Sequence, residues 1–299
     1  MLDKKKQLLA LVIAACLGTS AAQADELTGT LKKIKESGTV TLGYRDASLP
    51  FSYLNDAQQP IGYSIELCQK IVDQIKVKVG EPNLKTEYVS VVAATRTPLL
   101  INGTIDLECG VTTNTVERQK QIGFLLTSYV ASAKYAVKKS AGINSVDDLK
   151  GKAVVVITGG SGEWITKNLN RDKQLDLKIL NAKDGGEAFL MLETGRAVAY
   201  INDDVQLMAT IAQSRNPDNY TLLPEPMSAE PYAIGIRKND PQFKTFADDV
   251  LRNLYSSGVI NSQYPKWFEQ PIPPKNAVIN LPMSDALKQA IANPNDTGV

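Results

Sequence analysis

The sequence predicts an α/β fold with largely parallel sheets. Short runs rich in β-branched residues alternate along the chain with segments whose apolar residues recur at helical spacing, which is typical of strand–helix–strand units. The chain has 299 residues, enough for about two domains of roughly 100–200 residues each and for a sizeable core.

The first block is predicted in the order strand, helix, strand, helix, strand. Apolar residues from Ile65 to Ile75 follow helical spacing, and Asn102-Gly103 is a stop signal for a second, short helix. The predicted ranges are 39–44, 63–77, 86–92, 96–101 and 105–111.

A second block begins near residue 132. The tail after it is expected to be extended, because it holds Pro271, Pro273 and Pro274 before Ser284 begins a last short helix. The predicted strands are 134–138, 152–157, 177–180, 197–201 and 232–237, and the predicted helices are 164–169, 186–194 and 241–256.

Composition excludes several classes of protein. The 33 Lys and Arg residues balance 32 Asp and Glu residues, so the chain is not a strongly basic nucleic-acid-binding protein. It has no histidine, which excludes Ser-His-Asp triads, Cys-His dyads and zinc or haem held by histidine. Three cysteines are too few for a Cys₄ zinc site. We expect neither a metal nor a cofactor.

Residues 1–24 have the features of a cleaved signal peptide. Lys4–Lys6 precede an apolar run over 8–17, and Ala22-Gln23-Ala24 is an A-x-A cleavage site. The run is too short to span a bilayer, so we expect export to the periplasm rather than a membrane anchor; a buried N-terminal helix is the alternative. Cys16 loosely fits a lipoprotein processing site, but cleavage after Ala24 leaves the fuller apolar stretch.

Cys68 and Cys109 leave two alternatives open. In an oxidising compartment they can form a disulfide if their Cα atoms lie within about 7 Å. Otherwise they are buried free thiols.

A glycine-rich turn over 158–162 separates a predicted strand from a predicted helix. Backbone N–H groups converge on anions in such turns. The turn has neither the Gly-Lys-Ser/Thr of a P-loop nor the spacing of a dinucleotide-binding loop. It is therefore a contact for a small anion or a plain turn.

One predicted helix start carries an arginine. Asn114 with Glu117 three residues later forms a capping-box pattern. Arg118 then falls in the first helical turn, next to the hydroxyls of Thr112 and Thr113. A cation at this positive helix end is unfavourable unless a carboxylate or phosphate binds. We expect an anion site; the alternative is an ion pair of Arg118 with Glu117 or another surface acid.

Charged residues also lie at the ends of predicted strands. Arg45 ends the first strand, Arg96 lies near the end of the second, and Asp203 follows the strand 197–201. The carboxyl ends of parallel strands face the crevice in which α/β proteins bind ligands. The alternative for Asp203 is an acid of a solvated loop. Together with Arg118, these groups fit a zwitterion that carries an additional carboxylate.

The chain resembles the bacterial periplasmic amino-acid-binding proteins of ABC transporters, and most of all their glutamate/aspartate-binding group. The resemblance runs from about residue 31 to residue 285, and its most specific stretches are 43–53, 102–110, 112–120, 148–156, 193–199 and 271–276. It implies a type II fold of two α/β lobes joined by two hinge strands: lobe 1 over 25–131, lobe 2 over 132–231, and a return to lobe 1 with the tail over 232–299. It also implies a monomer that delivers an amino acid to a membrane permease and catalyses no reaction.

The resemblance also implies roles for single residues. Arg118 matches the arginine that binds the ligand's α-carboxylate, with Thr113 beside it, and Ser161 lies where the family has a threonine that touches the same group. Asp203 matches the acid that pairs with the α-ammonium. Arg45 and Arg96 match the two arginines that hold a side-chain carboxylate.

Four positions depart from the family pattern. Ala93 and Val111 stand where serines are common, and Gly185 stands where a histidine is common. A cysteine expected near Ile234 to pair with Cys109 is absent, which indicates that the family disulfide is lost. Three lost polar groups weaken or redirect recognition of the ligand side chain.

These departures keep other functions open beside capture of L-glutamate or L-aspartate. The first is binding of a neutral polar or another dicarboxylic amino acid. The second is a periplasmic cyclohexadienyl-type dehydratase, for which Glu163 and Asp184 are the candidate acid–base groups. The third is a sensory module that reports the ligand to a separate receptor.

Overall fold

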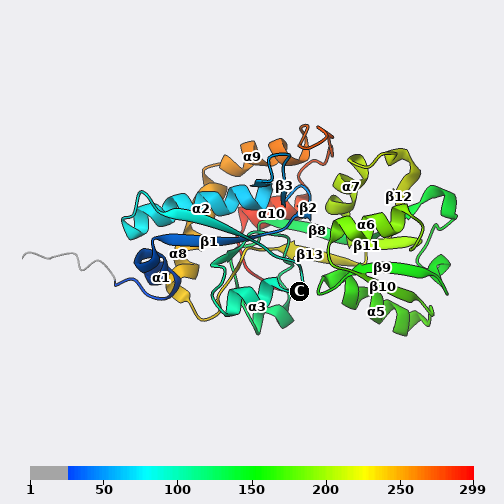
Figure 1. The fold of residues 1–299 in the computed structure, drawn as a ribbon, viewed down its shortest axis with the longest axis horizontal. Helices are drawn as coiled ribbons and strands as arrows, with labels where there is room; N and C mark the ends of the chain where they lie inside the picture. The colour runs from blue at the N-terminus through cyan, green and yellow to red at the C-terminus, as the bar shows by residue number, and fades with distance from the viewer. Residues whose placement is uncertain (1–25) are drawn as a thin grey trace, which may run out of the picture.

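The computed structural model describes residues 26–299, so the predicted leader over 1–24 and Cys16 lie outside the described residues. Two sheets with flanking helices form two lobes, which lie side by side in Figure 1. None of the helices in the described part of the chain has the length and apolar character that a membrane span requires.

Lobe 1 contains a five-stranded sheet in the order β5-β1-β6-β14-β7. A small antiparallel sheet, β2-β3-β4, lies beside it, and seven helices belong to this lobe. The strands are β1 (Thr39–Tyr44), β2 (Ala47–Ser48), β3 (Ser52–Leu54), β4 (Pro60–Ile61), β5 (Lys85–Ser90), β6 (Leu107–Glu108), β7 (Gly123–Phe124) and β14 (Gly235–Ile236). The helices are α1 (Gly29–Ser37), α2 (Tyr63–Val79), α3 (Arg96–Ile101), α4 (Val116–Gln119), α8 (Pro241–Ser256), α9 (Val259–Phe268) and α10 (Asp285–Ala292).

Lobe 2 contains a six-stranded sheet in the order β10-β9-β11-β8-β12, with β13 also paired to β8. Its strands are β8 (Tyr129–Lys138), β9 (Ala153–Ile157), β10 (Lys178–Ala182), β11 (Ala199–Asp203), β12 (Tyr220–Leu222) and β13 (Ser228–Tyr232). Its α-helices are α5 (Ser161–Lys173), α6 (Gly185–Glu193) and α7 (Asp204–Ala212). Short 3₁₀ turns occupy Lys139–Ala141, Asp147–Leu149 and Pro217–Asn219.

The two large sheets share one plan. In each, three neighbouring strands are parallel, namely β5-β1-β6 and β10-β9-β11. The next strand is antiparallel and arrives from the other lobe: β14 pairs with β6, and β8 pairs with β11. The parallel strands therefore direct their carboxyl ends toward the space between the lobes, where α/β proteins bind ligands.

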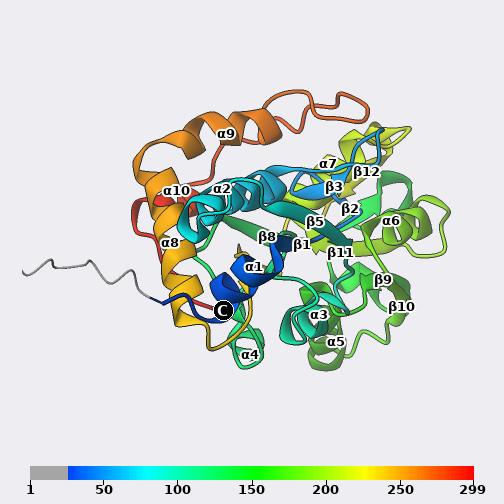
Figure 2. The ribbon, with the colours of Figure 1, turned by 60° about the vertical axis from the view of Figure 1, so that its left-hand side comes forward.

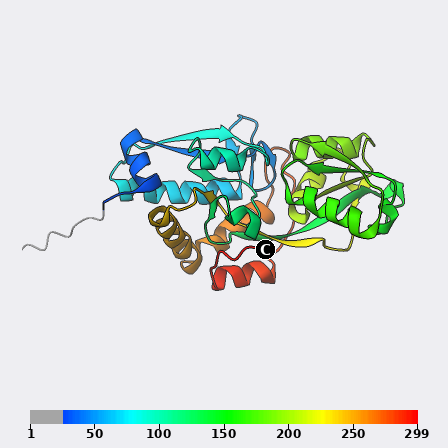
Figure 3. The same ribbon diagram turned by 90° about the horizontal axis from the view of Figure 1, so that it is seen from below.

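Two adjacent strands connect the lobes. The chain enters lobe 2 along β8 and returns along β13, and these strands pair antiparallel from Tyr129 opposite Tyr232 to Ala133 opposite Ser228. Figure 2 shows the lobes from another side, and Figure 3 shows the crossing strands with α10 (red) beside them. A pair of strands gives the molecule a narrow place at which to bend.

A disulfide between Cys68 and Cys109 links α2 to the chain just after β6. The alternative of two free thiols is thus wrong. Cys109 has a different partner from the one that the resemblance implied, and Ile234 is part of the buried core. The linked residues are 41 apart in sequence, so the bond restricts the unfolded chain considerably.

Many predicted elements match the structure and a few do not. The range 105–111 forms a strand only over Leu107–Glu108, because the chain then turns into the space between the lobes. The range 232–237 is divided between β13 and β14, which belong to different sheets. α9, which contains Pro265, was not predicted. The stretch with Pro271, Pro273 and Pro274 has neither helix nor strand, and Ser284 is the N-cap of α10, as predicted.

Candidate functional site

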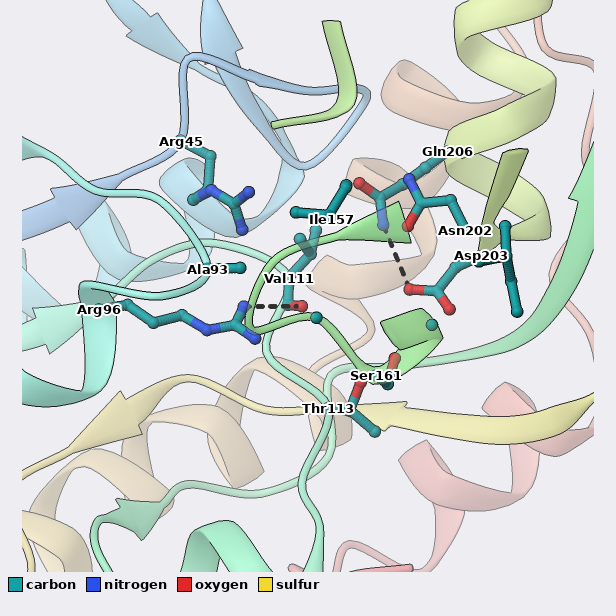
Figure 4. A pocket seen from close by; sticks show the side chains of 13 residues that line it. Arg45, Ala93, Arg96, Val111, Thr113, Ile157, Ser161, Asn202, Asp203 and Gln206 are labelled. Atoms are coloured by element: carbon teal, nitrogen blue, oxygen red, sulfur yellow. Dashed lines mark hydrogen bonds between the residues drawn. The ribbon is translucent and has the colours of Figure 1, made fainter. Parts of the chain in front are cut away.

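A cleft lies between the two lobes, with a volume of about 410 Å³ including the part open to solvent. Figure 4 shows the side chains that line it. Lobe 1 contributes Arg45, Ala93, Arg96, Val111 and Thr113, and lobe 2 contributes Ile157, Gly160, Ser161, Gly162, Ile201, Asn202, Asp203 and Gln206.

Two arginines of lobe 1 lie in this cleft. Arg45 follows β1, and Arg96 is the first residue of α3. Each is only 3% exposed. Arg96 donates from Nη1 to the carbonyl oxygen of Val111 at 3.3 Å, as Figure 4 shows. The guanidinium of Arg45 takes part in none of the hydrogen bonds found among residues 26–299.

Arg118, on α4, is outside the residues that line this cleft and lines a neighbouring pocket with Trp164 and Glu230. Its Nη1 donates to the carbonyl oxygen of Thr113 at 2.9 Å, and its Nη2 donates across the cleft to that of Gly159 at 3.2 Å. Arg118 therefore contacts both lobes. It forms no ion pair with Glu117, which pairs instead with Lys120.

The predicted cap of this helix was wrong by one residue. Thr115 is the N-cap, and its hydroxyl accepts a hydrogen bond from the backbone N–H of Arg118 at 3.1 Å. The side chain of Asn114 instead donates to the carbonyl oxygen of Asp296 at 2.8 Å. The segment that carries Arg118 is thus held by the end of the described chain, where Val116 also donates to the carbonyl oxygen of Val299 at 2.9 Å.

Arg45 and Arg96 are buried and Arg118 is half-buried, and the acids nearest to them, Glu108 among these, act on their pKa without forming an ion pair in the described part of the chain. None of them is in any of the ion pairs formed there. Burial and then the charge of Arg96 lower the pKa of Arg45 to about 10 and that of Arg118 to about 9. Burial also lowers the pKa of Arg96. A carboxylate in the cleft relieves this unfavourable arrangement.

Asp203 supplies a negative charge on the lobe 2 side. It ends β11, and its carboxylate accepts hydrogen bonds from the hydroxyl of Tyr232 and from Nε2 of Gln206 at 3.2 Å. Burial, followed by the charge of Glu230, raises its pKa to about 7. Glu230 is itself buried and accepts from the hydroxyl of Thr113 at 2.6 Å.

The two neighbouring threonines differ in position. Thr113 lines the cleft, whereas the hydroxyl of Thr112 donates to the carboxylate of Glu108 at 2.6 Å and Thr112 is outside the cleft lining. Glu108 lies on β6, and its charge acts on the pKa of Arg45 and Arg96. Thr112 thus holds an acid that faces the arginines.

The glycine-rich turn places Ser161 and the start of α5 in the cleft. Gly159 in this turn has φ +77°, and a Cβ there would lie 2.9 Å from Cα of Ala94 in the facing lobe. Glycine is needed at this position both for the positive φ and for the close approach of the lobes.

The acids proposed for a dehydratase have structural contacts. Glu163 pairs with Lys167 at 2.6 Å and accepts from the backbone N–H of Gly159 at 2.8 Å. Asp184 caps α6 by accepting from the backbone N–H of Glu187 at 2.9 Å. Neither acid is part of the cleft lining. Across residues 26–299, no group of three or more acidic or cysteine side chains is arranged to hold a metal ion.

Comparison with known protein families shows the family to which the chain belongs. Residues 40–270 match the model of the bacterial extracellular solute-binding proteins, family 3. The chain belongs to this family. The solute-binding fold is that of a type II periplasmic binding protein, as expected.

Relatives across nearly the whole length support this membership. The chain is 48% identical to the L-glutamate/L-aspartate-binding protein of Pseudomonas aeruginosa, over 97% of this chain and 96% of the relative. It is 40% identical to the glutamate/aspartate import solute-binding protein of Escherichia coli, over 95% of this chain and 96% of the relative. These relatives are transport proteins rather than enzymes.

Solved structures share the fold. A mutant of ArgBP from T. maritima superimposes with a TM-score of 0.70 at 26% identity, over 80% of this chain and 99% of that one. An ancestral arginine-binding protein bound to glutamine gives a TM-score of 0.69 at 29% identity, over 77% of this chain and 98% of that one.

Sequence reasoning missed part of the lining of this solute-binding protein. Gln206 lies one helical turn after Asp203 on α7, and an amide at this spacing from a strand-end acid was a usable signal. Glu230 and Tyr232 come from β13, far away in sequence, and no local pattern connects them with the cleft. Ala93 and Val111, where the family often has serine, do line the cleft.

Proposed function

We propose that this solute-binding protein captures L-glutamate or L-aspartate between its lobes and delivers it to an ABC transporter permease. One observation carries the proposal: Arg45 and Arg96 line the cleft with buried side chains, Arg118 lies half-buried beside it, and none of the three forms an ion pair among the described residues. The two relatives named above bind or import these acidic amino acids.

We assign the ligand's backbone groups to the part of the cleft near α4 and α5. Arg118, with Thr113 and Ser161 beside it, binds the α-carboxylate, and Asp203 binds the α-ammonium. Thr112 acts indirectly, through its hydrogen bond to Glu108.

The ligand's side-chain carboxylate goes to Arg45 and Arg96. Both are buried in the cleft on the lobe 1 side, and the charge of Arg96 lowers the pKa of Arg45, so an anion between them is favourable. A second carboxylate is the feature that separates acidic amino acids from neutral ones, so these two residues determine specificity.

Closure is a bending of the two crossing strands that brings 25–131 and 232–299 against 132–231. Ligand binding favours the closed form because Arg118 and Asp203 approach the ligand from opposite lobes. The closed protein, a monomer released into the periplasm after cleavage behind Ala24, is then the form that the permease recognises.

A neutral polar or another dicarboxylic amino acid is the second candidate. The observation in its favour is the apolar part of the lining, Ala93, Val111 and Ile157, which offers no side-chain hydrogen bond to the ligand. Such a surface discriminates weakly between ligands of similar shape.

A thermal-shift panel distinguishes the candidates. Ligand-free protein, refolded after removal of bound ligand, is heated with each common amino acid and with small dicarboxylates. A ligand at about 100 times its Kd adds roughly 2.7 kcal/mol, which is several degrees in Tm. Glutamate and aspartate should give the largest shifts. Shifts with neutral amino acids alone would refute acidic-ligand binding, and prephenate-like substrates test for the dehydratase.

A further inference from the structure

Tyr200 carries a buried hydroxyl that nothing in the described chain hydrogen-bonds. It lies on β11, directly before the cleft-lining residues Ile201 and Asn202. The residue is 1% exposed, and its hydroxyl oxygen forms no hydrogen bond of normal geometry within residues 26–299, although the side chain of Asn202 lies close enough to lower its pKa. A buried hydroxyl without a partner is costly, so its retention calls for a partner that binds there.

The hydroxyl lies where the two lobes meet. α6 begins at Gly185, and a Cβ added there would lie 3.4 Å from the Tyr200 hydroxyl oxygen and 3.3 Å from the carbonyl oxygen of Ala47. Ala47 belongs to β2 of lobe 1 and stands two residues after Arg45. Because Gly185 has no side chain, the space between the Tyr200 hydroxyl and Ala47 holds no side chain from the start of α6.

Electrostatics agree with this placement. The positive charge of Arg45 opposes the rise in the pKa of Tyr200 that burial causes, and Tyr200 in turn acts on the pKa of Arg45. The two side chains therefore lie in the same part of the junction between the lobes, where Arg45 lines the cleft and Tyr200 stands directly behind the lining residues Ile201 and Asn202. At neutral pH the phenol stays protonated, because burial raises its pKa, so it can donate a hydrogen bond.

Resting on the proposed function, we propose that Tyr200 is a specificity-determining residue whose hydroxyl donates a hydrogen bond to the side-chain carboxylate of the ligand held by Arg45. Lobe 2 then contributes to recognition of the second carboxylate, and not only to that of the backbone groups.

The test is the variant Tyr200→Phe, which removes only the unpaired oxygen. Tyr53→Phe is a matched control, since Tyr53 also has a buried hydroxyl without a partner, but packs against Trp267 in lobe 1. Calorimetric titration with L-glutamate and L-aspartate gives Kd for each protein, and urea denaturation gives the stability of each ligand-free protein.

We expect Tyr200→Phe to raise the Kd for L-glutamate about tenfold, the usual order for a hydrogen bond to a charged group. Tyr53→Phe should leave Kd unchanged, and neither variant should lose ligand-free stability. A change in Kd below about threefold for both ligands, or an equal change in both variants, would overturn the proposal. If the parent protein binds neither acidic amino acid, the proposed function itself fails, and the two failures are thus separable.

Discussion

Replacement of Arg45 by methionine separates the cost of a buried charge from its use in binding. Methionine keeps an unbranched apolar side chain in the same space and removes only the guanidinium. Arg45 is nearly fully buried, next to another arginine and without an ion-pair partner in residues 26–299. We therefore expect Arg45→Met to stabilise the ligand-free protein while it abolishes tight binding of acidic ligands.

The size of the stabilisation follows from the pKa. Burial and Arg96 lower the pKa of Arg45 from its ordinary 12.5 to about 10, and each pKa unit corresponds to about 1.36 kcal/mol. The charge thus costs the folded protein about 3 kcal/mol. Because the folded pKa lies below the unfolded one, this cost is fully present below about pH 10 and disappears as the pH rises toward 12.5. The lost ligand interaction is of similar size, about 2–5 kcal/mol, or at least a thirtyfold rise in Kd.

Urea denaturation and calorimetric titration measure the two effects. The control is Arg252→Met, since Arg252 is half exposed and pairs with Asp249 on the surface. There we expect a change in stability within about 0.5 kcal/mol and no change in Kd. If Arg45→Met destabilises the ligand-free protein, or if its Kd for glutamate equals that of the parent protein, the reasoning from an uncompensated cation is wrong.

Three further variants test other parts of the molecule. The folded pKa of Asp203 is raised to about 7, so the ligand-free protein should lose stability as the pH rises from about 4 to 7, and Asp203→Asn should remove that slope in urea denaturation. Gly159→Ala should raise the ligand Kd at least about tenfold, measured by titration, because its Cβ meets backbone of the facing lobe. Serine at both Cys68 and Cys109 should cost about 4 kcal/mol in urea denaturation, given the 41-residue separation.

Each of these has an outcome that contradicts it. A pH slope that persists in Asp203→Asn assigns the titration to another group. Gly151→Ala is the control for Gly159→Ala, because Gly151 also has positive φ, +73°, but open space around it; equal effects would show that backbone strain, not contact between the lobes, is responsible. A disulfide variant within about 1 kcal/mol of the parent would show that the bond hardly restricts the unfolded chain.

The sequence predicted correctly the bounds of those helices and strands that depend on neighbouring residues alone. β1, α3 and α8 have the predicted bounds, because alternation, a stop signal and an amphipathic repeat each act within a few residues. The range 105–111 was misjudged because strand propensity continues past Glu108, while pairing with β1 and β14 does not. Pairing depends on tertiary structure and overrides propensity.

The candidate site also has a part that local sequence predicts and a part that depends on tertiary structure. Charged residues at strand ends were recognisable because parallel strands direct them into one crevice, and Arg45, Arg96 and Asp203 do line it together. The contacts that hold them were not recognisable. The backbone N–H of Val116, beside Arg118, donates a hydrogen bond to Val299, and the hydroxyl of Tyr232 donates one to Asp203. These partners are far apart in sequence, so local patterns do not predict the contacts.

The strand β13 connects ligand binding with bending of the hinge. Glu230 accepts a hydrogen bond from Thr113 of lobe 1, and Tyr232 donates one to Asp203 of lobe 2. Thr113 and Asp203 are residues that we assign to the ligand's α-carboxylate and α-ammonium, and their partners Glu230 and Tyr232 both belong to β13. An arriving ammonium competes with Tyr232 for Asp203, so it alters a contact of the strand that must bend. Ligand binding therefore acts directly on the crossing strand β13. Its effect on the hinge does not have to pass through a longer series of contacts inside either lobe.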